Sequence, residues 1–306
     1  MAKLRGLSGL IKRNMLVFIT NKGSIFFSML TPLILLVLYI LFLKKTFLTP
    51  LENATAELGN LISSGDMDQF VNGLLLTGII STALLTIPYN ALEVMVKDRE
   101  DTTYYDMIST PVSRAEVIMS YFIAAVMTAF IQVMLVMACG LGMLAINGKV
   151  YLEITDILML SGLVFLGTVS STAIFMLLMM FIKSMSTSSA LMGILSAVSG
   201  FVVGAYIPLS EFGEKIQNVC NLIPATCVTI LIRNRLTGGT LNHMNENIGG
   251  LDNGMFADSM KEIFTFNSYV FGRNWELKQT LLYIIIITVI SVGAISIIYP
   301  KIYNKR

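Results

Sequence analysis

The sequence predicts an all-α integral membrane protein with six transmembrane helices, an N-terminal interfacial amphipathic helix, and a re-entrant helical hairpin before the last span. Hydrophobic residues make up 55% of the 306 residues and charged residues only 13%, whereas soluble domains carry about 25% charged residues. The apolar residues gather in long stretches without any charge, and about 18 such residues are enough to cross a bilayer.

The same composition excludes several function classes. The net charge is only +2, and no basic cluster suits nucleic acid. One histidine, His243, and three cysteines are too few for a Cys/His metal site or a His-based triad. The chain has no G-x-x-x-x-G-K-[ST] phosphate loop and no ionisable residue in its apolar stretches, which disfavours an intramembrane enzyme or an ion-coupled carrier. The driving force for any transport must then come from elsewhere, and a separate ATPase subunit would supply it.

Residues 1–22 form the first predicted unit, a cytoplasmic interfacial helix. Apolar and basic residues occupy opposite faces at helical spacing, with Leu4, Leu7, Ile11, Met15 and Phe18 on one face and Arg5, Lys12 and Arg13 on the other. A cleaved signal peptide is disfavoured, because the apolar stretch that follows is too long and ends in Lys44 and Lys45.

Residues 23–306 form the second predicted unit, a six-span transmembrane domain. The spans are expected at 23–43, 69–92, 117–148, 157–182, 184–210 and 279–300. Residues 216–232 contain Pro224 and several amides, so we expect a re-entrant or interfacial hairpin there, with a true seventh span as the alternative. Lys and Arg are enriched in the short loops on the N-terminal side, which predicts a multi-pass protein of the cytoplasmic membrane with both termini cytoplasmic.

The most charged short segment is the predicted cytoplasmic loop 96–116, which reads VKDREDTTYYDMISTPVSRAE. This loop resembles that of the membrane subunits of ABC exporters of the type 2 permease family, roughly E-R-x-x-G-T-L-E-x-L-L-x-T-P-V-S-R-x-E. The matching residues are Thr103, Met107, Ile108, Thr110, Pro111, Val112, Ser113, Arg114 and Glu116. Thr102 replaces the family's glycine, and Tyr105 replaces its usual glutamate.

The resemblance implies a short coupling helix that docks on a cytoplasmic ATPase, although a merely solvated loop is the alternative. Met107 and Ile108 would offer an apolar foot to the ATPase. Asp101 and Asp106 would add charge, and Pro111 would end the helix. The residues expected to take part in coupling are Glu100, Asp101, Thr103, Tyr105, Asp106, Met107, Ile108, Thr110, Pro111, Arg114 and Glu116.

A second resemblance follows the fifth predicted span. Gly204-Ala-Tyr-Ile-Pro208-Leu-Ser, then Asn221-Leu-Ile-Pro224, then Arg233 are similar to a family pattern that marks two short re-entrant helices on the outer side. Here Pro224 stands later than strict Asn-Pro adjacency, and Gly213 stands where a second proline is common. The alternative is that the two prolines only end helices at the interface.

The region 208–278 is therefore expected to be extracellular, with 236–276 forming a folded loop whose His243 is exposed. Cys220 and Cys227 could pair across a folded hairpin. On one continuous helix, however, their Cα atoms would lie about 10 Å apart, beyond disulfide reach.

Two further patterns concern packing. Ser196, Gly200 and Gly204 repeat every four residues and favour a close helix contact, either within one subunit or at the dimer seam where the family places spans one and five. Methionines are frequent in spans three to five, and we expect a permissive passage or ordinary packing rather than copper binding, for Met176, Met179, Met180, Met185 and Met192.

Together, these observations predict the permease subunit of an ATP-driven exporter. The resemblance implies a dimer with a second copy or a homologous permease, two cytoplasmic ATPase copies that bind ATP and Mg, no cofactor on this chain, and contact with membrane lipid but not nucleic acid. The uncharged spans favour a hydrophobic or amphipathic passenger that is drug-like, peptide or lipid-like. A polysaccharide or glycopolymer exporter permease and a non-transporting binding or immunity scaffold remain alternatives.

Overall fold

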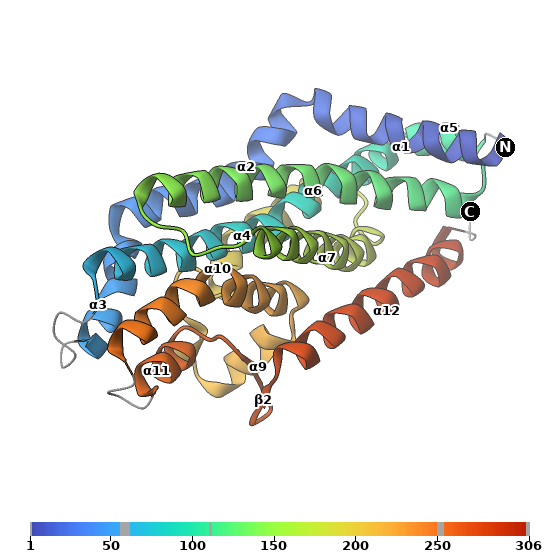
Figure 1. The fold of residues 1–306 in the computed structure, drawn as a ribbon. Helices are drawn as coiled ribbons and strands as arrows, with labels where there is room; N and C mark the ends of the chain where they lie inside the picture. The colour runs from blue at the N-terminus through green and yellow to red at the C-terminus, as the bar shows by residue number, and fades with distance from the viewer. Residues whose placement is uncertain (1, 56–61, 110–111, 250–253, 304–306) are drawn as a thin grey trace.

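The computed structural model describes residues 2–55, 62–109, 112–249 and 254–303, and these form an elongated helical bundle (Figure 1). The elements in chain order are α1 Ala2–Thr20, α2 Lys22–Leu38, the π-helix η1 Tyr39–Leu43, α3 Lys44–Thr55, α4 Ser64–Glu100, α5 Thr103–Ile108, α6 Arg114–Asn147, α7 Ile154–Met179, α8 Met185–Val202, the 3-10 turn η3 Leu209–Glu211, α9 Glu214–Leu222, α10 Pro224–Ile248, α11 Met255–Ile263, β1 Ser268–Val270, β2 Arg273–Trp275 and α12 Leu277–Tyr303.

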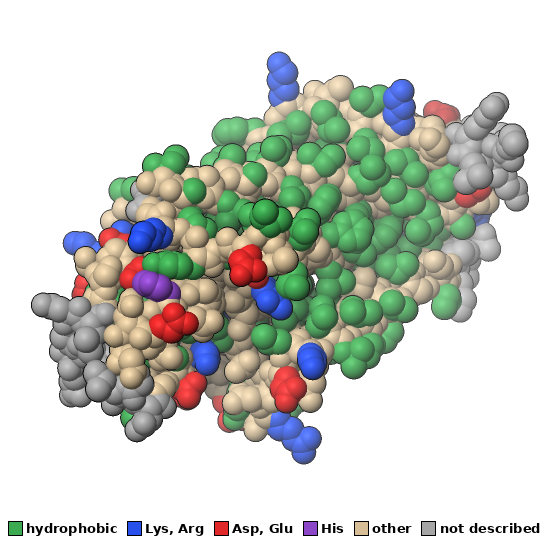
Figure 2. All heavy atoms as spheres, viewed as in Figure 1, with side chains coloured by type: hydrophobic (Ala, Val, Ile, Leu, Met, Phe, Trp, Pro, Cys, Tyr) green, Lys and Arg blue, Asp and Glu red, His purple; other side chains and the backbone are tan. Residues whose placement is uncertain are grey.

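Six helical segments among the described residues are long and apolar enough to cross a membrane, which confirms the predicted number. They are Lys22–Glu52, Ser64–Glu100, Arg114–Ile146, Ile154–Met179, Met185–Val202 and Leu277–Tyr299. Figure 2 shows hydrophobic side chains over the centre and right of this face, while most charged side chains lie toward its lower left and along its edges. This distribution is the one expected when the surrounding solvent is hydrocarbon.

The 37-residue helix α4 lies at the centre of the bundle. Its most apolar window is 89% buried, against 17% for α8 and 22% for α12. Its hydroxyl groups bond to the helix's own backbone, as when Oγ1 of Thr77 donates to the Gly73 carbonyl at 3.0 Å and Oγ1 of Thr86 to the Thr82 carbonyl at 3.0 Å. These bonds satisfy polar groups inside the bundle, so α4 can be buried without charged partners along its middle.

The N-terminal helix α1 packs along the first turns of α6, with Nδ2 of Asn14 donating to Oγ of Ser120 at 3.0 Å. The face turned toward the bundle carries Asn14 and Phe18, both only 2% exposed. The prediction that Arg13 lies on the solvent face is wrong, because its guanidinium pairs with the buried Asp98. Apolar residues occur on both faces of α1, so their spacing alone did not define which face packs.

The region before the last span contains the predicted bent helix pair. Helices α9 and α10 meet at 89°, and Pro224 occupies the first turn of α10, where its missing N–H costs nothing. The expected loop 236–276 is wrong over its first part, because α10 continues to Ile248. Gly239 lies inside α10 and does not form a turn, although glycine often does. A Cβ at that position would lie 2.2 Å from the backbone oxygen of Tyr151, so the glycine permits close backbone approach within a helix.

Both ends of the described chain lie at the same end of the bundle as α5 (Figure 1). The hydroxyl groups of Tyr104 on α5 and Tyr299 on α12 are 2.5 Å apart, which fixes this proximity. The same-side arrangement of the termini is the one that an even number of spans requires. Lys305 and Arg306, two of the Lys and Arg residues on the N-terminal side of the predicted topology, lie outside the described residues.

Candidate coupling site at the α4–α6 connection

The short helix expected between the second and third spans is present as α5. The chain leaves α4 through Asp101 and turns at Thr102, whose φ of 64° lies in the left-handed region. Glycine adopts this conformation without a steric penalty, whereas a side chain with a Cβ does not. The backbone thus explains why related loops carry glycine where this chain has threonine.

Helix α5 has one face against the bundle and one face in solvent. Tyr104 and Met107 are buried, at 4% and 8% exposure, whereas Tyr105 is 49% exposed and Asp106 is exposed. The expectation that Met107 forms an outward apolar foot is therefore wrong. A helix of six residues has too few turns for its apolar spacing to show which face packs, and here the aromatic Tyr105 takes the outward position.

Other predicted coupling residues have structural roles at helix ends. Oε2 of Glu100 accepts a hydrogen bond from the backbone N–H of Met185 at 2.8 Å and thereby holds the start of α8. Glu116 forms a capping box with Ser113, whose backbone N–H and hydroxyl each lie 2.7 Å from Oε2 of Glu116. Arg114 is the first residue of α6 and is half-buried.

The remaining predicted residues of this loop differ in exposure or lie outside the described residues. Asp101 is exposed and Thr103 is half-buried. Ile108 ends α5. Thr110 and Pro111 lie outside the described residues, so the expected helix stop at Pro111 stays a prediction.

Next to α5 lies an ion pair that the sequence reasoning missed. The two terminal guanidinium nitrogens of Arg13, Nη1 and Nη2, donate to the carboxylate of Asp98, with Nη2 at 2.8 Å from Oδ1. The hydroxyl of Tyr121 donates to Oδ2 of Asp98 at 2.6 Å and lies 3.6 Å from the sulfur of Met107. Asp98 is 4% exposed, and its hydrogen bond to Arg13 raises the pKa of that guanidinium. This Arg13–Asp98–Tyr121 network joins α1, α4 and α6 behind the coupling helix.

A second missed residue, Arg99, fixes the turn between α7 and α8. Its Nη1 donates to the carbonyls of Met180 and Ile182 at 3.2 and 3.1 Å, and its Nη2 donates to that of Met179 at 3.0 Å. These carbonyls form the end of α7, where a cation also complements the helix dipole. Because neighbouring Glu100 holds the start of α8, the end of α4 is bonded to both helices. The sequence offers a signal for this role, because Arg99 lies within the run of adjacent charges at 97–101.

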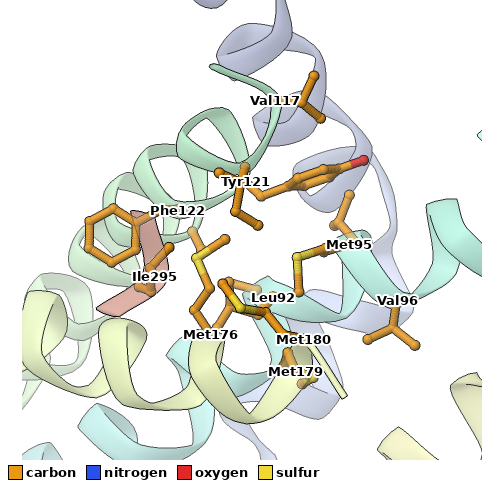
Figure 3. Close-up of a cluster of buried hydrophobic side chains, with 14 of the residues drawn as sticks. Leu92, Met95, Val96, Val117, Tyr121, Phe122, Met176, Met179, Met180 and Ile295 are labelled. Atoms are coloured by element: carbon orange, nitrogen blue, oxygen red, sulfur yellow. The ribbon is translucent and has the colours of Figure 1, made fainter. Parts of the chain in front are cut away.

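A hydrophobic cluster surrounds this network, and Figure 3 shows its side chains converging from several helices. Methionines contribute much of it. Met95 comes from α4 and Met107 from α5. The end of α7 contributes Met176, Met179 and Met180. Thioethers adapt to changing neighbours better than branched side chains do. The methionines singled out in the sequence at Met176, Met179 and Met180 are buried in this cluster, and Met185 and Met192 pack against it.

At the opposite end, the predicted re-entrant residues support the turn after α8 and the helices that follow. Gly204 has φ of 69° and ends α8, and Pro208 precedes η3. Arg233 is buried in α10, where Nη1 donates to the carbonyls of Phe264 and of Thr265, the latter at 2.8 Å. Arg233 therefore anchors the segment after α11 to α10.

The small-residue stripe of α8 is partly covered by the chain itself. A Cβ at Gly200 would lie 2.3 Å from the ring of Tyr206, so Gly200 accommodates a side chain of its own subunit. Ser196, one turn earlier, is half-buried. A role of the stripe at a dimer seam stays a prediction.

His243 is not the exposed loop residue that was expected, because it lies on α10. Its ring stacks on Tyr151 with centroids 4.4 Å apart, and Nδ1 is 3.5 Å from a carboxylate oxygen of Asp66. Cys220 and Cys227 are both free and buried. Among the residues that the structure describes, no group of three or more His, Cys, Asp or Glu side chains could hold a metal ion.

The six candidate spans among the described residues define a multi-pass membrane protein. Residues 6–236, about three quarters of the chain, match the family described as ABC-2 type transporter. The chain therefore belongs to the ABC-2 type transporter family, as the permease that lacks the ATPase domain, and such permeases partner ATPase subunits. No curated protein and no solved structure gives a significant match to the chain.

Proposed function

We propose that this permease exports a hydrophobic or amphipathic passenger, with both termini cytoplasmic, as a dimer with a second copy or a homologous permease and two ATPase subunits. The observation that carries the proposal is the placement of α5. Its exposed Tyr105 and Asp106 lie at the end of the bundle that holds both termini (Figure 1). An exposed aromatic side chain beside a carboxylate suits a protein–protein contact.

The contacts behind α5 support a route by which ATPase movement reaches the spans. Tyr104 contacts Tyr299 of α12, and Met107 contacts Tyr121 of α6. Tyr121 in turn bonds to Asp98 near the end of α4. Because the surrounding cluster is rich in methionine, these elements can shift against one another without leaving large voids. ATP-driven closure of the ATPases would thus move α5 together with α4, α6 and α12, and with α8 through Glu100.

The passenger class is supported by the character of the spans. The stretches 23–43, 69–92, 117–148, 157–182, 184–210 and 279–300 contain no Asp, Glu, Lys or Arg. A passage lined by such helices offers few groups that could pair with a charged passenger. This favours drug-like, peptide or lipid-like molecules as passengers.

The test changes the exposed face of α5 without touching its buried face. Tyr105→Glu and Asp106→Arg should each lower the amount of ATPase that copurifies with the permease in mild detergent by about tenfold, because each removes an exposed contact residue at the centre of a small interface. Export by membrane vesicles should fall in parallel. Changes at Met107 or Glu116 are less suitable, since the first is buried and the second caps α6.

The matched control is Phe271→Glu, at a side chain that is 71% exposed in the turn between β1 and β2. It should leave ATPase copurification unchanged. If the α5 variants retain the ATPase, or if the wild-type chain purifies without one, the coupling proposal is wrong and a non-transporting scaffold is favoured.

A further inference from the structure

A hydrophobic cavity of about 230 Å³ lies between α2, α4 and α6, away from the coupling site. Its lining is apolar except for the Tyr39 hydroxyl, the Asn72 amide and the thiol of Cys139. The side chains of Leu33, Leu135 and Met143 line it and are also 46%, 55% and 44% exposed. The cavity therefore opens at the apolar surface of the spans.

The height of the cavity fits one leaflet of a bilayer. Along α2 and the π-helix its lining runs from Met29 to Tyr39, which corresponds to about 15 Å at 1.5 Å per residue. That is about half of a 30 Å hydrocarbon core. The cavity is thus tall enough for the acyl chain of a single leaflet and too short for a molecule that crosses the whole membrane.

The polar groups at its end follow the order of the groups in a phospholipid. The Tyr39 hydroxyl donates to Oδ1 of Asn72, and among the described residues none accepts a hydrogen bond from Nδ2 of Asn72. Beyond this amide, Nζ of Lys44 lies 2.6 Å from Oδ1 of Asp68, and both side chains are partly exposed. Moving outward, the apolar wall is followed by an amide donor and then by the Lys44–Asp68 ion pair, whose two charges complement the phosphate and the choline of a zwitterionic headgroup.

The local backbone shapes this end of the cavity. The helix changes from α to π over Tyr39–Leu43, a change that often occurs at binding sites and here accompanies the turn of Tyr39 toward Asn72. On the facing helix a Cβ at Gly140 would lie 2.0 Å from Cδ1 of Leu76. Gly140 therefore brings α6 against α4 at the floor of the cavity.

We propose that this cavity binds one acyl chain of a phospholipid from the leaflet at the α3 end of the bundle. The ester carbonyl accepts a hydrogen bond from Nδ2 of Asn72, and the phosphate lies beside Lys44. An empty cavity would forfeit the contacts of its lining atoms, and acyl chains are the molecules that reach its opening. This site is independent of ATPase docking.

The test uses the full chain in phosphatidylcholine vesicles that contain a phosphatidylcholine with a diazirine in its acyl chain. After illumination, mass spectrometry should find labelling of Cys139 and Met143 about fivefold above that of Leu158 and Ile290, because a bound chain stays longer than a free boundary chain. The last two are exposed at 68% and 59% and lie outside the cavity.

The variant Val136→Trp fills the cavity and should remove most of this excess. Ile131→Trp is the matched control, because Ile131 lies on the same helix, is 50% exposed and does not line the cavity. Equal labelling of cavity and boundary residues in the wild type, or an excess that survives Val136→Trp, would overturn the proposal. ATPase copurification from the same preparations reports on coupling separately.

Cys139 supplies a second measurement that needs no variant. It is the exposed thiol, whereas Cys220 and Cys227 are buried. Alkylation of Cys139 by N-ethylmaleimide should be about tenfold slower after phosphatidylcholine is added back to delipidated protein, because the bound chain covers the thiol. An unchanged rate contradicts the site even if Val136→Trp does not fold.

Discussion

We expect that removing Arg13 and removing Asp98 weaken the attachment of α1 to the bundle by different amounts. The Arg13 side chain is 33% exposed and the Asp98 side chain only 6%. In Asp98→Asn the guanidinium can return to water, so we expect α1 to lose about 1 to 2 kcal/mol of attachment. In Arg13→Met the carboxylate stays buried without its bidentate partner, and the expected loss is about 3 kcal/mol.

The double variant distinguishes a true pair from two separate contacts. Asp98→Asn with Arg13→Met leaves neither charge unpaired, so its loss should be smaller than that of Arg13→Met alone. Hydrogen exchange of the α1 amides, measured by mass spectrometry in detergent, reports the opening equilibrium directly. A loss of about 3 kcal/mol corresponds to opening increased by about a hundredfold. Equal effects of the two single variants, or additive effects in the double variant, would refute this account.

Two further predictions concern backbone and packing, and both are measured by thermal unfolding in detergent. Thr102→Gly should raise stability by about 1 kcal/mol, because glycine removes the strain of the left-handed turn before α5; a lower midpoint would contradict this. Gly78→Ala should lower stability by about 1 to 3 kcal/mol, since the new Cβ would lie 2.7 Å from Cβ of Ala205. The matched control Gly142→Ala has open space around it and should be neutral or stabilising, so similar losses in both variants would refute the packing argument.

The spans were predictable because bilayer burial excludes charge over long stretches. Helix α4 nevertheless runs on to Glu100, eight residues past its predicted end. The charged residues in this extension find protein partners, as Asp98 does in Arg13 and Glu100 in the start of α8. Such pairings join residues far apart in sequence, and no periodicity within one helix indicates them.

The presence of a short helix at α5 was predicted by resemblance, but its orientation was not. Whether Met107 or Tyr105 faces outward depends on the positions of Tyr121 and Tyr299, which tertiary packing determines. The region around α10 also depends on tertiary contacts that the local sequence does not reveal. Glycine usually signals a turn. Gly239 nevertheless lies inside α10, where the backbone of Tyr151 approaches it closely. Local propensity is overridden where another segment supplies the contact.

The burial of α4 determines which parts of the protein experience the lipid. Helices α8 and α12 expose most of their surface, so a change in bilayer thickness or composition acts on them directly. Helix α4 meets other helices on nearly every side, so apart from the cavity beside Asn72 the bilayer can reach it only by first displacing its neighbours. The end of α4 that leads into α5 lies away from that cavity and is thereby insulated from membrane composition, so one subunit can keep the same connection to α5 in membranes of different lipid content.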